Sequence, residues 1–115
     1  MSYQQALFNT TYGRLDAAAV LAGYTTILNV ANVSGSIANN IGCSTIIYFS
    51  STLDADIVIS FDNGTTDSFF LHANKSLTID LSAGNMLFTG IIRIKRFSGA
   101  PAAGSIACSV VRTRV

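Results

Sequence analysis

The sequence has very little charge and lacks two common residue types altogether. Only 11% of its 115 residues are charged, whereas about 25% is ordinary for a soluble domain, and half are apolar. Glutamate and tryptophan are absent, and there is a single proline. This composition excludes intrinsic disorder, which requires low hydrophobicity and high charge. All six acidic residues are aspartate, which favours turns over helices, so the absence of glutamate argues against a helical fold.

The chain also lacks the residue sets that common catalytic and metal sites require. His72 is the only histidine and no nucleophile motif accompanies it, so we interpret it as a residue at the end of a strand. Four aspartates flank one predicted hairpin, but their spacing does not match a calcium-binding loop, and turn formation explains them: Asp54, Asp56, Asp62 and Asp67. We therefore expect no enzyme activity, no catalytic residue, no cofactor and no metal site.

Cysteine is nearly absent, with two residues, Cys43 and Cys108. They have no CxxC spacing and, with one histidine in the chain, predict no zinc site. Both lie in apolar, strand-like runs, and free cysteine is among the most buried residue types. We favour two buried free thiols, with one disulfide as the alternative.

Long apolar runs and a strong net charge are missing too. No apolar run approaches the roughly 18–20 residues that a membrane span needs. The run Ala17–Gly23 follows Asp16 and other polar residues, so we expect no secretion signal there. With a net charge of +1, we expect neither nucleic acid nor membrane as a partner.

Short apolar runs between turn residues fill the chain from residue 25 onward. Seven strands are predicted, over 25–31, 44–50, 56–61, 67–72, 76–81, 90–97 and 105–112, with a short or irregular stretch at 86–88. Asn63 and Gly64 tolerate positive φ and predict a type I′ hairpin turn. Connections this short require antiparallel pairing. The predicted fold is all-β, an antiparallel β-sandwich or jelly-roll-like barrel of about seven or eight strands.

Alternation within these runs predicts which side chains face the core. Inward positions recur at every second residue of a half-buried strand. The predicted core is Ile47, Phe49, Ile57, Ile59, Phe61, Leu77, Ile79, Leu81, Ile92, Ile94, Ile106 and Val110.

Residues 1–24 differ in pattern, and we predict an N-terminal arm there, beside a β-sandwich domain over 25–115. The arm contains a candidate short helix, Arg14–Leu21, that ends before Gly23. Its apolar and aromatic side chains need a surface to pack on. The predicted interface residues of the arm are Tyr3, Leu7, Phe8, Tyr12 and Leu15.

Charges of opposite sign are separated along the chain. Residues 54–80 hold five aspartates and one lysine, whereas five basic residues and no acid follow residue 85: Arg93, Lys95, Arg96, Arg112 and Arg114. If the strands over 90–97 and 105–112 pair, these five form a basic patch. Three interpretations stay open: a solvated face that pairs with aspartate-bearing strands, a charge-complementary contact between subunits, and a nucleic-acid site, for which no stacking pattern is present.

A longer stretch carries a family resemblance. Residues 46–80 read IIYFSSTLDADIVISFDNGTTDSFFLHANKSLTID, followed by SAGN and then TGIIRIKRFSGAPAAGSIACSVV. Over roughly residues 44–112 this order of turns and alternating strands resembles small all-β structural proteins of tailed bacteriophages, namely capsid decoration proteins and head-tail or fibre adaptors. The arm is not covered by the resemblance.

The resemblance implies a non-enzymatic virion component, assembled in the cytoplasm of a bacterial host. The implied partners are major capsid, portal or connector, or fibre subunits, and further copies of the chain as a homo-oligomer. A capsid decoration or minor capsid protein is the expected role, and a tail, collar or fibre adaptor is the alternative. A further alternative is a carbohydrate-binding β-sandwich, for which Tyr48 and Phe70 are the mid-domain aromatic candidates.

Overall fold

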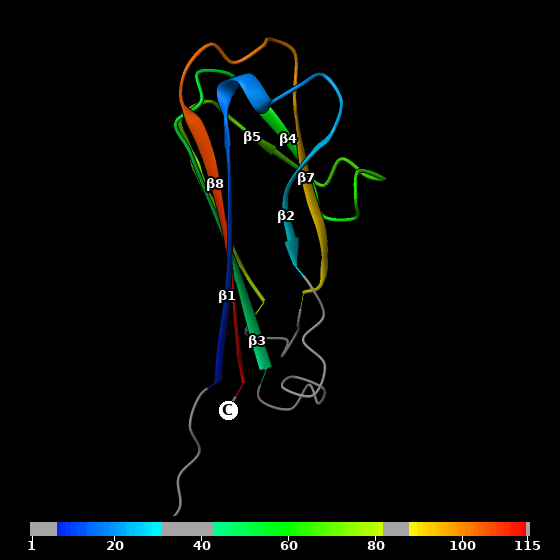
Figure 1. Cartoon of the computed structure of the whole chain (residues 1–115), viewed down its shortest axis with the longest axis vertical. Coiled ribbons are helices and arrows are strands. Elements are labelled where there is room, and N and C mark those ends of the chain that lie inside the picture. The colour runs from blue at the N-terminus through cyan, green and yellow to red at the C-terminus, as the bar shows by residue number, and fades with distance from the viewer. Residues whose placement is uncertain (1–6, 31–42, 82–87, 115) are drawn as a thin grey trace, which may run out of the picture.

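The protein is built from two four-stranded antiparallel β-sheets packed face to face (Figure 1). The computed structural model describes residues 7–30, 43–81 and 88–114. Within these ranges the strands are β1 (Leu7–Asp16), β2 (Thr25–Val30), β3 (Cys43–Ser51), β4 (Ile57–Ser60), β5 (Phe69–Leu71), β6 (Ser76–Asp80), β7 (Gly90–Arg96) and β8 (Ser105–Arg114). One turn of 3-10 helix, η1 (Ala17–Ala19), follows β1. The described ranges contain no helix long and apolar enough to cross a membrane.

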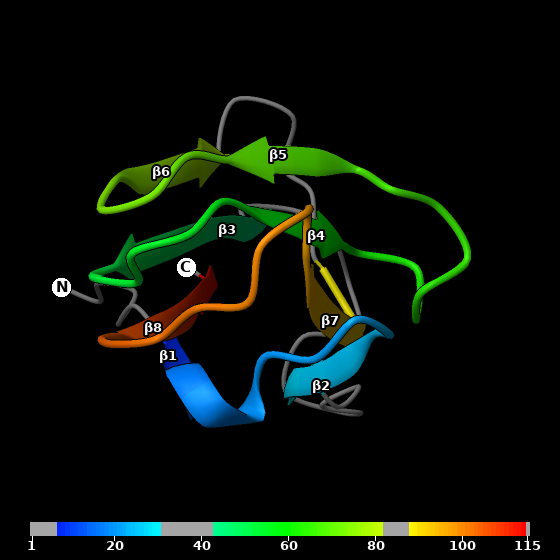
Figure 2. The ribbon, with the colours of Figure 1, turned by 90° about the horizontal axis from the view of Figure 1, so that it is seen from above.

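The order of the strands is that of a jelly roll. Sheet A has the order β1-β8-β3-β6 and sheet B the order β2-β7-β4-β5, so most consecutive strands lie in different sheets. Seen from above, β1, β8, β3 and β6 lie opposite β2, β7, β4 and β5 respectively (Figure 2). This arrangement is one of the ways in which antiparallel proteins with eight strands bury their apolar faces. The predicted all-β fold is confirmed, and the jelly roll is the member of the predicted pair that forms.

The seven strands predicted from residue 25 onward correspond to β2 through β8. The turn predicted at Asn63 and Gly64 also forms, since their φ angles are +61° and +87° and the amide of Thr65 donates to the carbonyl of Asp62 at 3.3 Å. The strands on either side of it are shorter than predicted, because residues 61–68 form a loop and pairing of β4 with β5 starts at Ile59 and Phe69. Residues 86 and 87 of the stretch predicted at 86–88 lie outside the described residues.

The core lies between the sheets and consists of the inward residue of each alternating pair. Of the predicted core, eight side chains are at most 2% exposed: Ile47, Phe49, Ile57, Ile59, Ile92, Ile94, Ile106 and Val110. Three others, Phe61, Leu77 and Ile79, are partly buried and pack against these, and Leu81 is half-buried. Each fully buried aliphatic or aromatic side chain stabilises the fold by about 1.5–3 kcal/mol relative to leaving it exposed.

The N-terminal segment differs from the predicted arm. Residues 7–16 form β1, which pairs with β8 along its whole length, from Leu7 opposite Arg114 to Asp16 opposite Ser105. The predicted helix is reduced to the single turn η1, because residues 14–16 belong to the strand. The physical reason is that the ten-residue strand β8 would otherwise leave the backbone donors and acceptors of every second residue unpaired along one side. Residues 1–6 lie outside the described residues.

The two cysteines are far apart along the sheet. Cys108 lies opposite Phe49 in the pairing of β8 with β3, whereas Cys43 lies opposite Arg114. Six residues of strand between Cys43 and Phe49 correspond to about 20 Å, far beyond the roughly 7 Å that a disulfide can span between Cα atoms. Cys108 is a free thiol with no exposed surface, so the disulfide alternative is wrong for this fold.

Candidate interaction surfaces

Among the side chains that the structure describes, the outer face of sheet A is aromatic and carries no charge at its centre. One row across the four strands consists of Tyr12, Ser109, Tyr48 and Thr78, each opposite the next. Tyr12 is 61% exposed and Tyr48 is 44% exposed, although Ile47 and Phe49 on either side of Tyr48 are buried. The next row contains Val111, opposite the exposed Ile46. We call Tyr12, Ile46, Tyr48, Thr78, Ser109 and Val111 the sheet A face.

Charged side chains border this face without entering its centre. Arg14 and Asp16 form an ion pair of 3.1 Å near the end of β1, and Asp80 lies at the edge of β6 opposite Ile46. Depletion of charge at the centre with tyrosine present and polar groups at the rim is the composition of protein–protein interfaces. The sheet A face is therefore a candidate contact surface.

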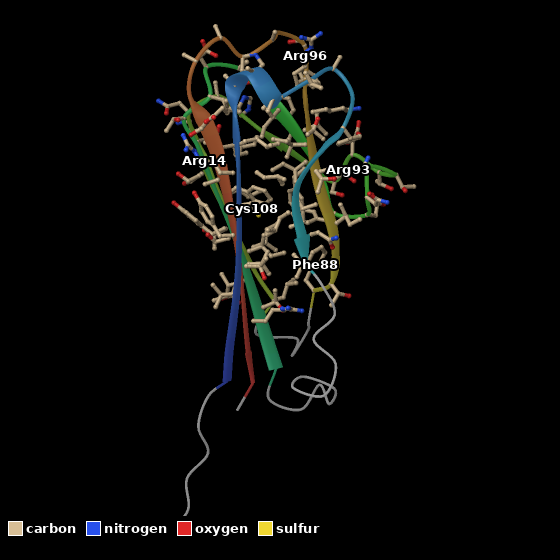
Figure 3. The ribbon with its side chains drawn as sticks, in the orientation of Figure 1. Arg14, Phe88, Arg93, Arg96 and Cys108 are labelled. Carbon is tan, nitrogen blue, oxygen red and sulfur yellow. The ribbon has the colours of Figure 1, made fainter. Side chains whose placement is uncertain are left out.

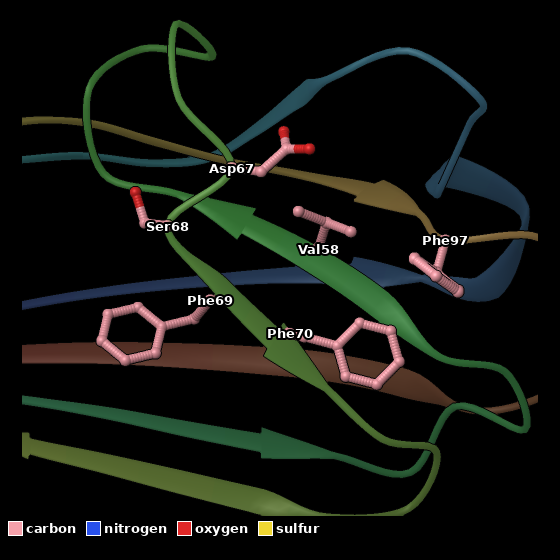
Figure 4. A pocket seen from close by; sticks show the side chains of 6 residues that line it. All are labelled: Val58, Asp67, Ser68, Phe69, Phe70 and Phe97. Atoms are coloured by element: carbon pink, nitrogen blue, oxygen red, sulfur yellow. The ribbon is translucent and has the colours of Figure 1, made fainter.

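The outer face of sheet B carries an aromatic hollow. The hollow has a volume of about 310 Å³ and is lined by Val58, Asp67, Ser68, Phe69, Phe70 and Phe97 (Figure 4). Phe70 and Phe97 are 42% and 59% exposed and meet edge to face, with ring centroids 4.7 Å apart. His72 packs edge to face on the other side of this pair, 4.7 Å from the Phe70 ring.

The loop that bounds the hollow is fixed by a hydrogen-bond network around Ser60. The buried Ser60 hydroxyl donates to Asp62 Oδ1 at 2.7 Å and accepts from the amide of Gly64 at 2.9 Å. The same carboxylate oxygen accepts from the amide of Thr66 at 2.8 Å. Hydrogen bonds from Thr66 and from the Ser60 hydroxyl lower the pKa of Asp62 to about 2. This network holds the 61–68 loop, whose residues Asp67 and Ser68 line the hollow.

Tyr24, Asp67 and Lys95 form a second network that fastens the loop to sheet B. The Tyr24 hydroxyl donates to Asp67 Oδ1, and Lys95 Nζ lies 3.4 Å from the same oxygen. Lys95 Nζ also lies 4.7 Å from the centroid of the Tyr24 ring, within cation–π range. The hydrogen bond from Tyr24 lowers the pKa of Asp67, with a smaller effect from Lys95, while burial and the same hydrogen bond raise the pKa of Tyr24 to about 12.

The basic patch predicted from the sequence does not form. The strands β7 and β8 lie in different sheets, so the expected pairing between them is wrong. Arg93 lies on the outer side of β7, Arg96 at the end of that strand, and Arg14 on the opposite side of the molecule (Figure 3). Arg112 is only 2% exposed, because the alternation of β8 turns it inward after Ile106, Cys108 and Val110. The backbone of Arg114 pairs with Leu7, and its side chain lies outside the described residues.

The predicted arm residues have different positions. Tyr12 lies on the sheet A face, whereas Leu15 is partly buried and packs against the core. Leu7 and Phe8 are paired with β8 through their backbones, and their side chains lie outside the described residues. Tyr3 lies outside them as well. The role of this segment in assembly stays a prediction.

Asp54, Asp56 and His72 make contacts within and between loops. Asp54 accepts from the amides of Ala102 and Ala103, and these bonds lower its pKa. Asp56 accepts from the amide of Ala73 at 2.8 Å and lies 3.7 Å from His72, which follows β5 directly. Among the residues that the structure describes, no group of three or more histidines, cysteines or acids could hold a metal ion.

Comparison with known proteins gives the fold. No protein-family profile and no curated protein matches the chain. A solved subunit of the Bacillus endospore appendages, which form disulfide-linked pili, matches with a TM-score of 0.58 and 14% identity over 99% of this chain and 92% of the other. A chain of the cyanophage Pam1 capsid asymmetric unit matches with a TM-score of 0.56 and 13% identity over 100% of this chain and 93% of the other. The chain thus shares its jelly-roll fold with subunits of a pilus and of a viral capsid.

Proposed function

We propose that the chain is a non-enzymatic structural subunit of a phage particle, most directly a capsid decoration or minor capsid protein. The observation that carries this proposal is the sheet A face, a tyrosine-bearing surface with charge only at its margins. Further support comes from the likeness in fold to a chain of a cyanophage capsid and from the sequence resemblance to phage structural proteins. A jelly roll with such a face suits a protein whose function is to bind its neighbours.

The neighbour that contacts this face is a second copy of the chain. Three strands of nine or ten residues and one of five cover about 500 Å² of sheet, at about 3.3 Å per residue and 4.8 Å between strands. Two copies in contact over the whole outer side of sheet A bury about 1,000 Å², the lower limit for a specific interface. Tyr48 on the inner strand β3 and Tyr12 on the edge strand β1 are suited to a face that packs against its own copy, as a two-fold contact requires.

The solution mass of the full chain tests the proposal. Light scattering is measured on the wild type and on Tyr48→Lys, at chain concentrations from about 10 μM to about 1 mM, which covers the affinities of small interfaces. We expect the wild type to exceed the monomer mass of 12.1 kDa in a concentration-dependent manner. Tyr48→Lys is expected to remain a monomer, because it places a charge at the centre of the contact.

Phe97→Lys is the matched control, because it introduces the same charge at an aromatic residue that is 59% exposed on the other sheet. Its mass should equal that of the wild type. A wild type that stays monomeric throughout, or a control that dissociates as readily as Tyr48→Lys, contradicts the proposed contact. Deletion of residues 1–24 is a poor test, because it removes β1 and leaves one side of β8 unpaired.

The number of copies per particle separates decoration from adaptor roles. Quantitative mass spectrometry of purified particles should find hundreds of copies of a decoration protein, because it follows the symmetry of the shell. About a dozen copies or fewer indicate the alternative, a tail, collar or fibre adaptor near the portal. Absence of the chain from the particles contradicts both roles.

A further inference from the structure

The aromatic hollow on sheet B lies on the other side of the molecule from the sheet A face and is not needed for the proposed contact. Two partly exposed rings, Phe70 and Phe97, form its apolar part, with Val58 between their strands. Asp67 contributes a carboxylate to its rim, whereas the Ser68 hydroxyl points away from the two rings, toward the 61–68 loop, where it donates to the carbonyl of Thr66 at 3.4 Å (Figure 4). An apolar lining with a small number of polar groups is typical of small-ligand sites.

We propose that this hollow binds a carbohydrate, with one sugar ring against Phe70 and Phe97 and its hydroxyls toward Asp67. A pyranose has an apolar side of C–H groups, which complements the electron-rich face of an aromatic ring. Its hydroxyls donate to carboxylates and exchange hydrogen bonds with other hydroxyls. The geometry offers both kinds of contact within one hollow of about 310 Å³, at the small end of ligand sites.

The balance of charge selects a neutral ligand. The carboxylate of Asp67 is compensated by Lys95, whose ammonium lies 3.4 Å away, and it also accepts from Tyr24. A cationic ligand would have to compete with Lys95 for this carboxylate, and an anionic ligand would have to compete with Asp67 for the Lys95 ammonium. A ligand with many hydroxyls and no charge meets neither obstacle.

The polar rim is held in place before a ligand arrives. Asp67 and Ser68 belong to the 61–68 loop, whose conformation is fixed by hydrogen bonds of the Ser60 hydroxyl and the Asp62 carboxylate. The Ser68 amide donates to the carbonyl of Ile59 at 2.9 Å, and its hydroxyl accepts from the Phe61 amide at 3.3 Å. Binding therefore costs little ordering of the loop, which favours affinity for a small ligand.

A glycan array probed with the full chain tests the proposal, followed by NMR titration with the methyl glycoside of the best-binding sugar. We expect the amides of Phe70 and Phe97 to shift on titration. Phe97→Ala should weaken binding at least tenfold, and its side chain is exposed enough for the fold to persist. Asp67→Asn should weaken binding about tenfold, because a charge-assisted hydrogen bond to a sugar hydroxyl is lost.

Leu21→Ala is the matched control, because Leu21 is an apolar side chain of similar exposure to Phe97, 55% against 59%, and belongs neither to the hollow nor to the sheet A face. It should bind the same sugar as tightly as the wild type. An array without signal above background overturns the proposal, as does binding that Leu21→Ala abolishes and Phe97→Ala leaves intact. If Phe97→Lys lowers the solution mass, a second copy occupies the hollow and the proposal is likewise wrong.

Discussion

Gly13 of β1 lies directly against the carbonyl group of Ile27 in β2, so that a β-carbon at position 13 would overlap the Ile27 oxygen. The two residues belong to edge strands of different sheets. Their contact joins the sheets backbone to backbone along one open side of the jelly roll. Glycine is required at this point because of the close approach between two strands.

We predict that Gly13→Ala lowers the free energy of unfolding by about 1–3 kcal/mol, because the backbone of β2 must shift to admit the methyl group. Urea denaturation of the full chain measures the change. Gly23→Ala is the control, because a β-carbon there meets nothing within 4 Å, and it should change stability by less than about 0.5 kcal/mol. Equal effects of the two substitutions on the free energy of unfolding would show that the close contact with Ile27 is not the reason for glycine at position 13.

The network around Ser60 predicts a loss of stability in acid. Hydrogen bonds from Thr66 and Ser60 hold the pKa of Asp62 at about 2 in the folded chain, below the usual value of 3.8. A carboxyl whose pKa is lowered by folding stabilises the native state above pH 4, and this contribution is lost as the pH falls from about 4 to about 2. Urea denaturation between pH 2 and pH 7 should show a shallower acid slope for Asp62→Asn than for the wild type.

Asp16→Asn is the comparison for that experiment, because Asp16 lies at the surface and pairs with the side chain of Arg14. Its acid slope should stay closer to that of the wild type. If Asp62→Asn has the slope of the wild type, the carboxylate does not stabilise the loop in solution.

The strands could be predicted from the sequence because alternation and turn residues are local signals. The pair Asn63 and Gly64 marked a turn whose φ angles the structure reproduces, and the inward positions of β3, β4, β7 and β8 followed from period two. The strand β1 was missed, because Asn9, Thr10, Thr11 and Gly13 interrupt the apolar alternation. Its pairing with β8 depends on residues about a hundred positions away, which a local pattern does not contain.

The candidate surfaces were harder to predict, because they depend on the order of the strands. Adjacent strands in the sequence suggested a basic patch, yet β7 and β8 separate into different sheets. Arg112 was expected at the surface because arginine is rarely buried, although it continues the inward series of Val110. The hollow combines Phe70 from β5 with Phe97 beyond β7, and its fastening joins Tyr24 to Asp67, 43 residues apart. Of the residues that line the hollow, the sequence indicates only Phe70 as a candidate for carbohydrate binding.

Cys108 should be chemically inert in the folded chain. Burial raises the pKa of its thiol to about 12, and thiolate is the form that reacts with alkylating reagents. At pH 8 we expect iodoacetamide to modify Cys108 only as fast as the protein unfolds, and rapidly in urea, as peptide mass spectrometry can show. Labelling of Cys108 in the native protein at the rate of a free peptide thiol would contradict its place in the core.

The fastening of the loop to sheet B predicts a specific change in one carboxyl group. The hydrogen bond from Tyr24 is the largest of the effects that lower the pKa of Asp67, with Lys95 a smaller one. Tyr24→Phe removes that bond while it retains the aromatic ring beneath Lys95, so the pKa of Asp67 should rise toward its usual value. An NMR titration of the Asp67 carboxyl carbon measures the change.

Tyr48→Phe is the control for this experiment, because it removes a tyrosine hydroxyl from the opposite sheet, and it should leave the titration of Asp67 as it is. If Tyr24→Phe also leaves it unchanged, the Tyr24 hydroxyl does not bond to Asp67 in solution, and the 61–68 loop is held by the Ser60 network and Lys95 alone.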